Sequence, residues 1–76
     1  MQARDLQARD RFADNARELR EQRGMTQEQL ADASGLHLNT ISKLENKERE
    51  PLMTTIAKLA KGLEVPLGPL FDGVDP

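Results

Sequence analysis

The sequence predicts an all-α fold, a compact bundle of about five helices, from three observations. Apolar residues recur at helical spacing along most of the 76-residue chain. No stretch alternates apolar and polar residues as a strand does, and no Asn-Gly or Asp-Gly pair joins two such stretches. The length allows a single small domain, and without cysteine no disulfide stabilises it. Its stability must come from helix packing, from a partner, or from both.

The first helix is predicted from a stripe of residues at helical spacing, and Gly24 ends it. The stripe consists of Phe12, Ala16, Leu19 and Arg23. Charged residues fill the opposite face, where Arg17 and Glu21 stand four residues apart. Residues 1–8 precede the stripe and are expected to be an N-terminal extension of the domain.

The second helix begins with the clearest local signal in the chain. Thr26 and Gln29 have the spacing of a capping box, in which each side chain accepts a hydrogen bond from the other residue's backbone N–H. This signal predicts a helix over about residues 27–33. Gly35 follows, and glycine readily takes the left-handed conformation that a tight turn needs.

A third helix, residues 38–45, is predicted by the apolar residues Leu38, Ile41 and Leu44. A polar loop, residues 46–50, follows and stops at Pro51. The fourth helix has the inward stripe Leu52, Ile56, Leu59, Ala60 and Leu63. The nearby prolines allow only a brief helical turn at about residues 67–71, and residues 72–76 form a tail.

Composition excludes several classes of function. The formal net charge of −2 differs from the positive charge typical of proteins that coat nucleic acid. Two phenylalanines without Trp or Tyr disfavour base stacking on single strands. The chain has one histidine and no cysteine, no apolar run long enough to span a membrane, and no signal peptide at its start. We therefore expect a cytoplasmic protein without a metal, a cofactor or a membrane partner.

Residues 26–45 resemble the helix-turn-helix of the phage-repressor and Cro-like (Xre) family of transcriptional regulators. The resemblance extends from about Arg17 to Phe71 and depends on several features that stand in register. These are Thr26-Gln27, Leu30-Ala31, the turn glycine Gly35, Ile41, and Leu44-Glu45 followed by a basic residue and Pro51. In size the chain is similar to restriction-modification controller proteins. The resemblance implies a lambda-repressor-like DNA-binding domain over residues 1–76.

The resemblance further implies that residues 38–45 form a reading helix, whose outward edge lies in the major groove of double-stranded DNA. The residues that match base-edge positions are Leu38, Asn39 and Lys43. An amide can pair with adenine, an ammonium group can reach guanine, and an apolar side chain can pack on the thymine methyl. The alternative for Asn39 and Lys43 is ordinary solvated helix surface.

Contacts with the DNA backbone are implied for Gln27, Thr40, Asn46, Lys47 and Arg49. Gln27 stands at a helix N-terminus, where free N–H groups favour phosphate. Thr40 has an equal alternative, which is to close the first turn of its own helix. Lys47 occupies a position where the family usually has glycine, so the chain is expected to be strained there. His37 replaces the usual Ser or Thr N-cap and is expected to cap poorly.

Arg20 and Glu45 match a pair that forms a partly buried ion pair between the first and third helices of the resembled family. The role of this pair would be structural, because it would fix the reading helix against the bundle. The alternative for Arg20 is one more charge on the polar face of its helix, but its position beside Leu19, near the apolar stripe, favours the pairing.

The C-terminal part is predicted to form a homodimer. Four apolar residues, Leu67, Leu70, Phe71 and Val74, lie within eight positions of a very small domain. The bundle has limited room for them, so some are expected to form an exposed apolar patch that contacts a second copy. The alternative is that Leu67 and Leu70 cap the core while Val74 frays with the tail.

Three classes of function compete. The first is a sequence-specific regulator that binds double-stranded DNA as a homodimer on a pseudo-palindromic operator. The second is a protein-interaction or antitoxin-like module of the same fold with weak DNA binding, which the acidic balance favours. An enzyme is the third, but the sequence has no cysteine nucleophile, Gly-x-Ser-x-Gly motif or glycine-rich phosphate loop. With no room for a ligand-binding domain, no small-molecule ligand is expected.

Overall fold

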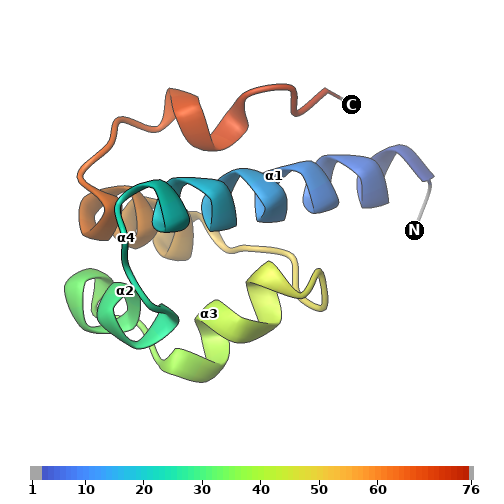
Figure 1. Cartoon of the computed structure of the whole chain (residues 1–76). Coiled ribbons are helices and arrows are strands. Elements are labelled where there is room, and N and C mark those ends of the chain that lie inside the picture. The colour runs from blue at the N-terminus through green and yellow to red at the C-terminus, as the bar shows by residue number, and fades with distance from the viewer. Residues whose placement is uncertain (1–2, 76) are drawn as a thin grey trace.

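The computed structural model describes residues 3–75 and contains the four α-helices α1 to α4 and a short 3-10 helix, η1 (Figure 1). Their bounds are Ala3–Gln22, Gln27–Ser34, Leu38–Glu45, Met53–Leu63 and Gly68–Phe71. No strand occurs among these residues, so the all-α prediction is confirmed. The expected fifth helix is only a 3-10 turn, because Pro66 precedes it and Pro69 lies within it, and a proline donates no backbone hydrogen bond.

The helices are arranged around α1, which runs through the middle of the molecule (Figure 1). Helices α2 and α3 lie on one side of α1, and the C-terminal segment returns along its other side. Helix α4 packs mainly against α2. Within the described part of the chain, no helix is both long and apolar enough to cross a membrane.

Helix α1 is longer than the sequence stripe predicts. It begins at Ala3, so the expected extension is helical from that residue onward. Its buried face includes Phe12, Ala13 and Ala16, whereas Arg23 is exposed and lies beyond the helix. The chain turns at Gly24, which has a φ of 67°. The predicted stripe is therefore correct only up to Leu19, which packs against the core.

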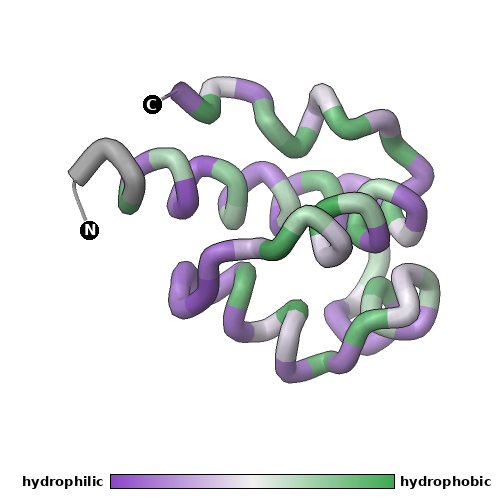
Figure 2. Tube along the Cα trace, turned by 180° about the vertical axis from the view of Figure 1, so that it is seen from behind, coloured by the Kyte–Doolittle hydropathy of each residue, from purple (hydrophilic) through white to green (hydrophobic). Residues whose placement is uncertain are grey.

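The core is formed by every described element. Its largest fully buried side chains are Leu30, Ile41, Leu44, Leu59, Leu63 and Leu70. These residues come from α2, α3, α4 and η1, and they close over the apolar face of α1. Figure 2 shows hydrophobic segments along the helices, while the loop after α3 is a continuous hydrophilic stretch.

Helix α2 begins with the predicted capping box. The Thr26 hydroxyl accepts a hydrogen bond from the Gln29 backbone N–H at 3.1 Å, and the Gln29 side-chain oxygen accepts one from the Thr26 N–H at 2.8 Å. The helix ends at Gly35, whose φ of 73° is the left-handed conformation expected there. Helix α3 then begins after His37, which makes no side-chain capping hydrogen bond, as expected.

Helix α4 begins one residue later than predicted. Leu52 is the N-cap residue, with an extended backbone, and the residue is 70% exposed. Its place in the inward stripe is therefore wrong, because a residue outside the helix does not follow helical periodicity. The core-facing stripe of α4 starts at the half-buried Ile56 and continues through Leu59 and Leu63.

Candidate nucleic-acid interface

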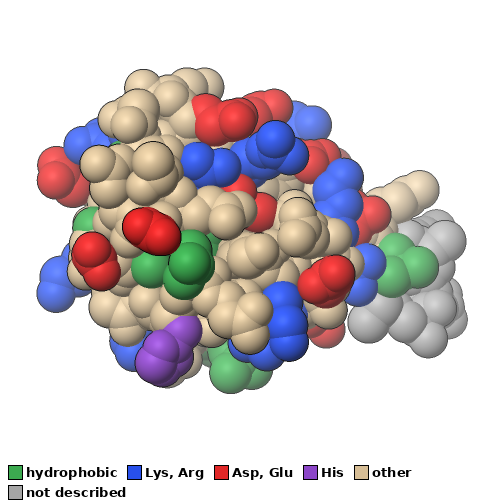
Figure 3. All heavy atoms as spheres, turned by 60° about the horizontal axis from the view of Figure 1, so that its bottom comes forward, with side chains coloured by type: hydrophobic (Ala, Val, Ile, Leu, Met, Phe, Trp, Pro, Cys, Tyr) green, Lys and Arg blue, Asp and Glu red, His purple; other side chains and the backbone are tan. Residues whose placement is uncertain are grey.

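Helix α3 has one side in the core and the other toward solvent. Ile41 and Leu44 are buried, whereas Leu38 and Asn39 are exposed and Lys43 is half-buried. The three predicted base-reading residues therefore lie on the side of α3 that faces away from the core. Figure 3 shows this side of the molecule, where the one histidine, hydrophobic groups and charged groups of both signs reach the surface.

The residues expected to contact the DNA backbone lie at three places around α3. Gln27, half-buried, is the first residue of α2, and Thr40 is in the first turn of α3. Asn46, Lys47 and Arg49 are exposed in the loop that follows α3. The backbone N–H of Thr40 donates to the His37 carbonyl at 3.0 Å and so closes the first turn of α3, while the role of its side chain stays a prediction.

The loop after α3 is strained at Lys47, as the missing glycine predicts. Lys47 has a φ of 64°, a left-handed conformation that favours glycine. Its ammonium group lies 3.3 Å from the Asp14 carboxylate of α1, in an ion pair whose two side chains are exposed. Arg49 is exposed between Glu48 and Glu50, which are exposed as well.

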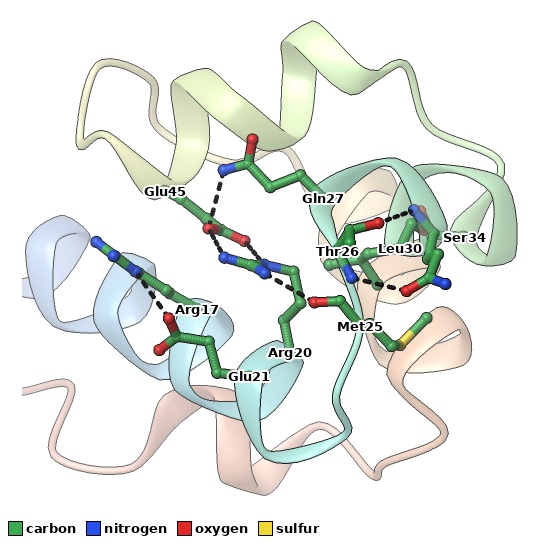
Figure 4. Close-up of polar contacts among 10 residues, drawn as sticks. Arg17, Arg20, Glu21, Met25, Thr26, Gln27, Leu30, Ser34 and Glu45 are labelled. Carbon is green, nitrogen blue, oxygen red and sulfur yellow. Dashed lines mark hydrogen bonds and ion pairs between the residues drawn. The ribbon is translucent and has the colours of Figure 1, made fainter.

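Arg20 and Glu45 form the ion pair that the resemblance implies. Arg20 Nε donates to Glu45 Oε2 at 2.8 Å, and a second guanidinium nitrogen donates to Oε1 at 2.9 Å (Figure 4). The side chains are only 12% and 3% exposed. The remaining guanidinium nitrogen donates to the Met25 carbonyl at 2.8 Å. The hydrogen bond with Glu45 raises the pKa of Arg20 above its ordinary value despite the opposing effect of burial.

Gln27 has a partner that the sequence did not reveal. Its Nε2 donates to Glu45 Oε1 at 3.1 Å, so Glu45 receives hydrogen bonds from both α1 and α2 (Figure 4). The predicted role of Gln27 is a phosphate contact at the N-terminus of α2, and it stays a prediction. Because 18 residues separate the partners, no local pattern indicates the bond.

The predicted dimer residues divide into buried and exposed groups. Leu70 is fully buried and belongs to the core, so its expected place in an exposed patch is wrong. The C-terminal segment packs on α1 through η1, and this contact places Leu70 in the core. Val74 is half-buried against the core, whereas Leu67 and Phe71 are exposed.

The exposed pair lies beside residues of α4 that the sequence reasoning did not assign to this surface. Met53, Ile56 and Ala57 line a shallow apolar hollow of about 210 Å³ together with Leu67 and Phe71. Met53 is 86% exposed. We call these five residues the apolar hollow.

The C-terminal segment is held by polar residues that the sequence reasoning missed. Buried Asn15 donates to the carbonyl oxygens of Leu70 at 2.9 Å and Asp72 at 2.8 Å. Arg11 also donates to the Asp72 carbonyl, at 3.1 Å. The available signal was the position of Asn15, three residues after Phe12 and thus on the buried face of α1.

Comparison with known proteins identifies the kind of domain. The helix-turn-helix family HTH_3 matches residues 17–70. The control protein C.SmaI of Serratia marcescens is 44% identical over 52 residues, which cover 68% of this chain and 62% of that protein. The transcriptional repressor RghR of Bacillus subtilis is 45% identical over 56 residues, covering 72% of this chain and 42% of RghR. The chain thus spans less than two thirds of the length of these two relatives.

A solved structure has the same fold over nearly its whole length. The restriction-modification controller protein C.AhdI of Aeromonas hydrophila superposes with a TM-score of 0.80 and 36% sequence identity. The superposition covers 88% of this chain and 97% of C.AhdI. The matched part includes the helix pair whose outward edge carries Leu38, Asn39 and Lys43. The chain therefore belongs to the helix-turn-helix (HTH_3) family, as the resemblance to Xre-like regulators indicates.

Proposed function

We propose that this chain is a sequence-specific regulator of transcription that binds double-stranded DNA as a homodimer on a pseudo-palindromic operator. The observation that carries the proposal is the outward edge of α3, which is held against α1 by the Arg20–Glu45 ion pair. A rigid helix with its polar edge free can enter a major groove without rearrangement of the domain. The family relationship with transcriptional regulators supports this use of the edge.

In this proposal, three side chains of α3 recognise the bases. In this proposal Asn39 pairs with adenine, Lys43 donates to guanine O6 or N7, and Leu38 packs on a thymine methyl group. Exposure of Leu38 supports the last contact, because an apolar side chain in water gains by covering a methyl group. Each residue reads a different chemical feature, so together they define a short half-site.

In this proposal, residues on either side of the reading helix contact the phosphate groups. Gln27 and the free N–H groups at the start of α2 would meet one phosphate group. Thr40, from the first turn of α3, is a further candidate for the same strand. Asn46, Lys47 and Arg49 would meet the backbone beyond the end of α3, because their loop is exposed and hydrophilic. Such contacts orient the domain but carry no sequence information.

A homodimer would bind two half-sites. Its contact surface in this proposal is the apolar hollow, where Leu67 and Phe71 from the C-terminal segment meet α4. A two-fold axis through that surface would place two copies of α3 about one helical turn of DNA apart, which is about 34 Å. The operator would then be pseudo-palindromic.

The experiment that tests this proposal is selection of bound duplexes from a random DNA pool. We expect an enriched motif with two related half-sites whose centres are about 10 base pairs apart. The control protein is Asn39→Ala/Lys43→Ala, which retains the core residues of α3 and should enrich no motif. A wild-type protein that enriches no motif contradicts the proposal.

A protein-interaction module of the same fold is the second candidate. It is favoured by the net charge of −2 and by the two glutamates that flank Arg49 in the exposed loop. Both features weaken attraction to phosphate. Absence of motif enrichment together with a stable wild-type fold would favour this second function.

A further inference from the structure

We propose that Glu45 is a positioning residue for DNA binding, because it orients the amide of Gln27 toward a phosphate group. The inference rests on the proposed DNA-binding function. The carboxylate of Glu45 would thus have two effects, since it pairs with Arg20 inside the bundle and also fixes a side chain at the surface.

The hydrogen bonds around Glu45 determine which way the amide points. An ionised carboxylate only accepts hydrogen bonds, so it attracts the NH₂ group of Gln27 rather than its oxygen. Nε2 lies 3.1 Å from Glu45 Oε1, and the same oxygen accepts a bond from Arg20 at 2.9 Å. Figure 4 shows the Gln27 oxygen pointing away from Glu45. The amide therefore has one defined orientation before any DNA binds.

The fixed orientation leaves one donor for a ligand. Nε2 carries two hydrogens, and one of them bonds to Glu45. Among the described residues, the bond to Glu45 is the one hydrogen bond that this nitrogen donates. Gln27 also lines a shallow hollow with Arg20, Thr26, Glu28 and Leu38, beside the start of α2 and of α3. The second N–H is therefore available to a phosphate oxygen that enters this hollow.

Orientation before binding increases affinity because less side-chain freedom is lost in the complex. A glutamine side chain free in solvent would lose rotamer freedom when it contacts phosphate. Here the bond to Glu45, whose side chain is 3% exposed and held by two hydrogen bonds from Arg20, restricts that freedom in advance. Glu45 thereby links the end of the reading helix to the start of α2.

The test uses a variant for which electrostatics and side-chain positioning predict opposite changes in the affinity for DNA. Glu45→Gln removes a negative charge close to the proposed phosphate site, so charge alone would make DNA binding tighter. If Glu45 orients Gln27, the same variant weakens binding to the selected duplex by about threefold to tenfold. In a Gln27→Met background, Glu45→Gln should cause no such loss. Fluorescence anisotropy measures the four dissociation constants, at a temperature where circular dichroism shows each variant to be folded.

Glu21→Gln is the matched control. It also neutralises a glutamate paired with an arginine, but that pair with Arg17 is exposed and lies within α1. It should leave the affinity unchanged or slightly increased. The inference is overturned if Glu45→Gln binds the duplex as tightly as the wild type, or if it weakens binding equally with and without Gln27. A wild type that binds no duplex would instead refute the proposed function itself.

A measurement on the unmodified protein keeps the inference testable if Glu45→Gln does not fold. Nuclear magnetic resonance resolves the two Nε2 protons of each glutamine. One Gln27 proton should exchange slowly with solvent and the other quickly. Gln29 is the internal control, because its amide oxygen is the bonded atom and its NH₂ group has no such bond among the described contacts. Equal, fast exchange of both Gln27 protons would show that Glu45 does not hold the amide.

Discussion

Asn39, Lys43 and Arg49 differ in what their side chains can recognise on DNA. Asn39 and Lys43 lie on the outward edge of α3, and Arg49 lies in the loop beyond it. We expect Asn39→Ala and Lys43→Ala each to weaken specific binding by about 1–3 kcal/mol and to relax the preference at one base position. Arg49→Ala should weaken binding to all sequences and flatten the salt dependence, since it removes a phosphate contact.

Affinity measurements over a panel of operator variants at several salt concentrations distinguish the proposed base contacts from the proposed phosphate contact. Lys43 and Arg49 are the informative comparison, because each substitution removes one positive charge. If both variants lose affinity uniformly across the panel, Lys43 is a phosphate contact and not a base reader.

The Arg20–Glu45 ion pair gives a second prediction at this scale, for the free energy of unfolding. The pair is nearly buried, so Arg20→Met or Glu45→Met alone leaves an unpaired charge and should cost about 3–5 kcal/mol. The double variant should cost much less than the two single variants together, because it leaves no unpaired charge and fills a similar volume. Denaturant titration of the three variants measures the coupling. A coupling energy near zero would show that the pair does not act as a unit.

Between elements, α4 packs closely on α2 at Gly62. A Cβ added to Gly62 would lie 2.8 Å from the Ser34 Cβ and 2.9 Å from the Ser34 backbone nitrogen. Ser34 is buried, and its hydroxyl donates to the Leu30 carbonyl at 2.7 Å. The two helices approach this closely because one of them has no side chain at the contact.

Gly62→Ala should therefore destabilise the protein by about 1–3 kcal/mol, because the backbone of α2 must move. Helix propensity alone predicts the opposite sign, a gain of about 1 kcal/mol. The difference between Lys58→Ala and Lys58→Gly, at an exposed position of the same helix outside the apolar hollow, is the reference for that propensity. Thermal unfolding followed by circular dichroism compares the two. An increase in stability for Gly62→Ala would show that the contact between α2 and α4 adapts without cost.

The elements that sequence predicts well are those with local signals. The capping box at Thr26 and the glycine at position 35 define the ends of α2, and both are present as expected. Apolar spacing likewise places Ile41 and Leu44 in the core. By contrast, the burial of Leu70 and the bond from Gln27 to Glu45 depend on residues distant in sequence. Such features follow from how elements pack, which periodicity within one element cannot show.

At the scale of the whole molecule, the apolar hollow is the surface that a second copy of the chain would cover in the proposed dimer. The monomer exposes 4937 Å² of surface, and a standard protein interface buries about 800 Å² on each partner. A domain this small gains much from such burial, since its own core is limited. Asn15 and Arg11 hold the C-terminal segment on α1, so Leu67 and Phe71 face solvent in a fixed arrangement. A second copy of this surface is the partner we propose.

Met53→Glu is the cleanest test of that dimer. Met53 is 86% exposed, so a charge there should leave the monomer fold intact but oppose burial in an apolar contact. We expect dimerisation to weaken at least about tenfold, which corresponds to about 1.4 kcal/mol. Leu38→Glu is the matched control, because it places the same charge on an exposed leucine of the proposed DNA-binding surface and should leave the dimer unchanged. Analytical ultracentrifugation at tens of micromolar protein, with circular dichroism to verify the helices, measures both. A wild type that stays monomeric at that concentration without DNA, or a folded Met53→Glu protein that dimerises as the wild type does, would exclude the apolar hollow as the dimer interface.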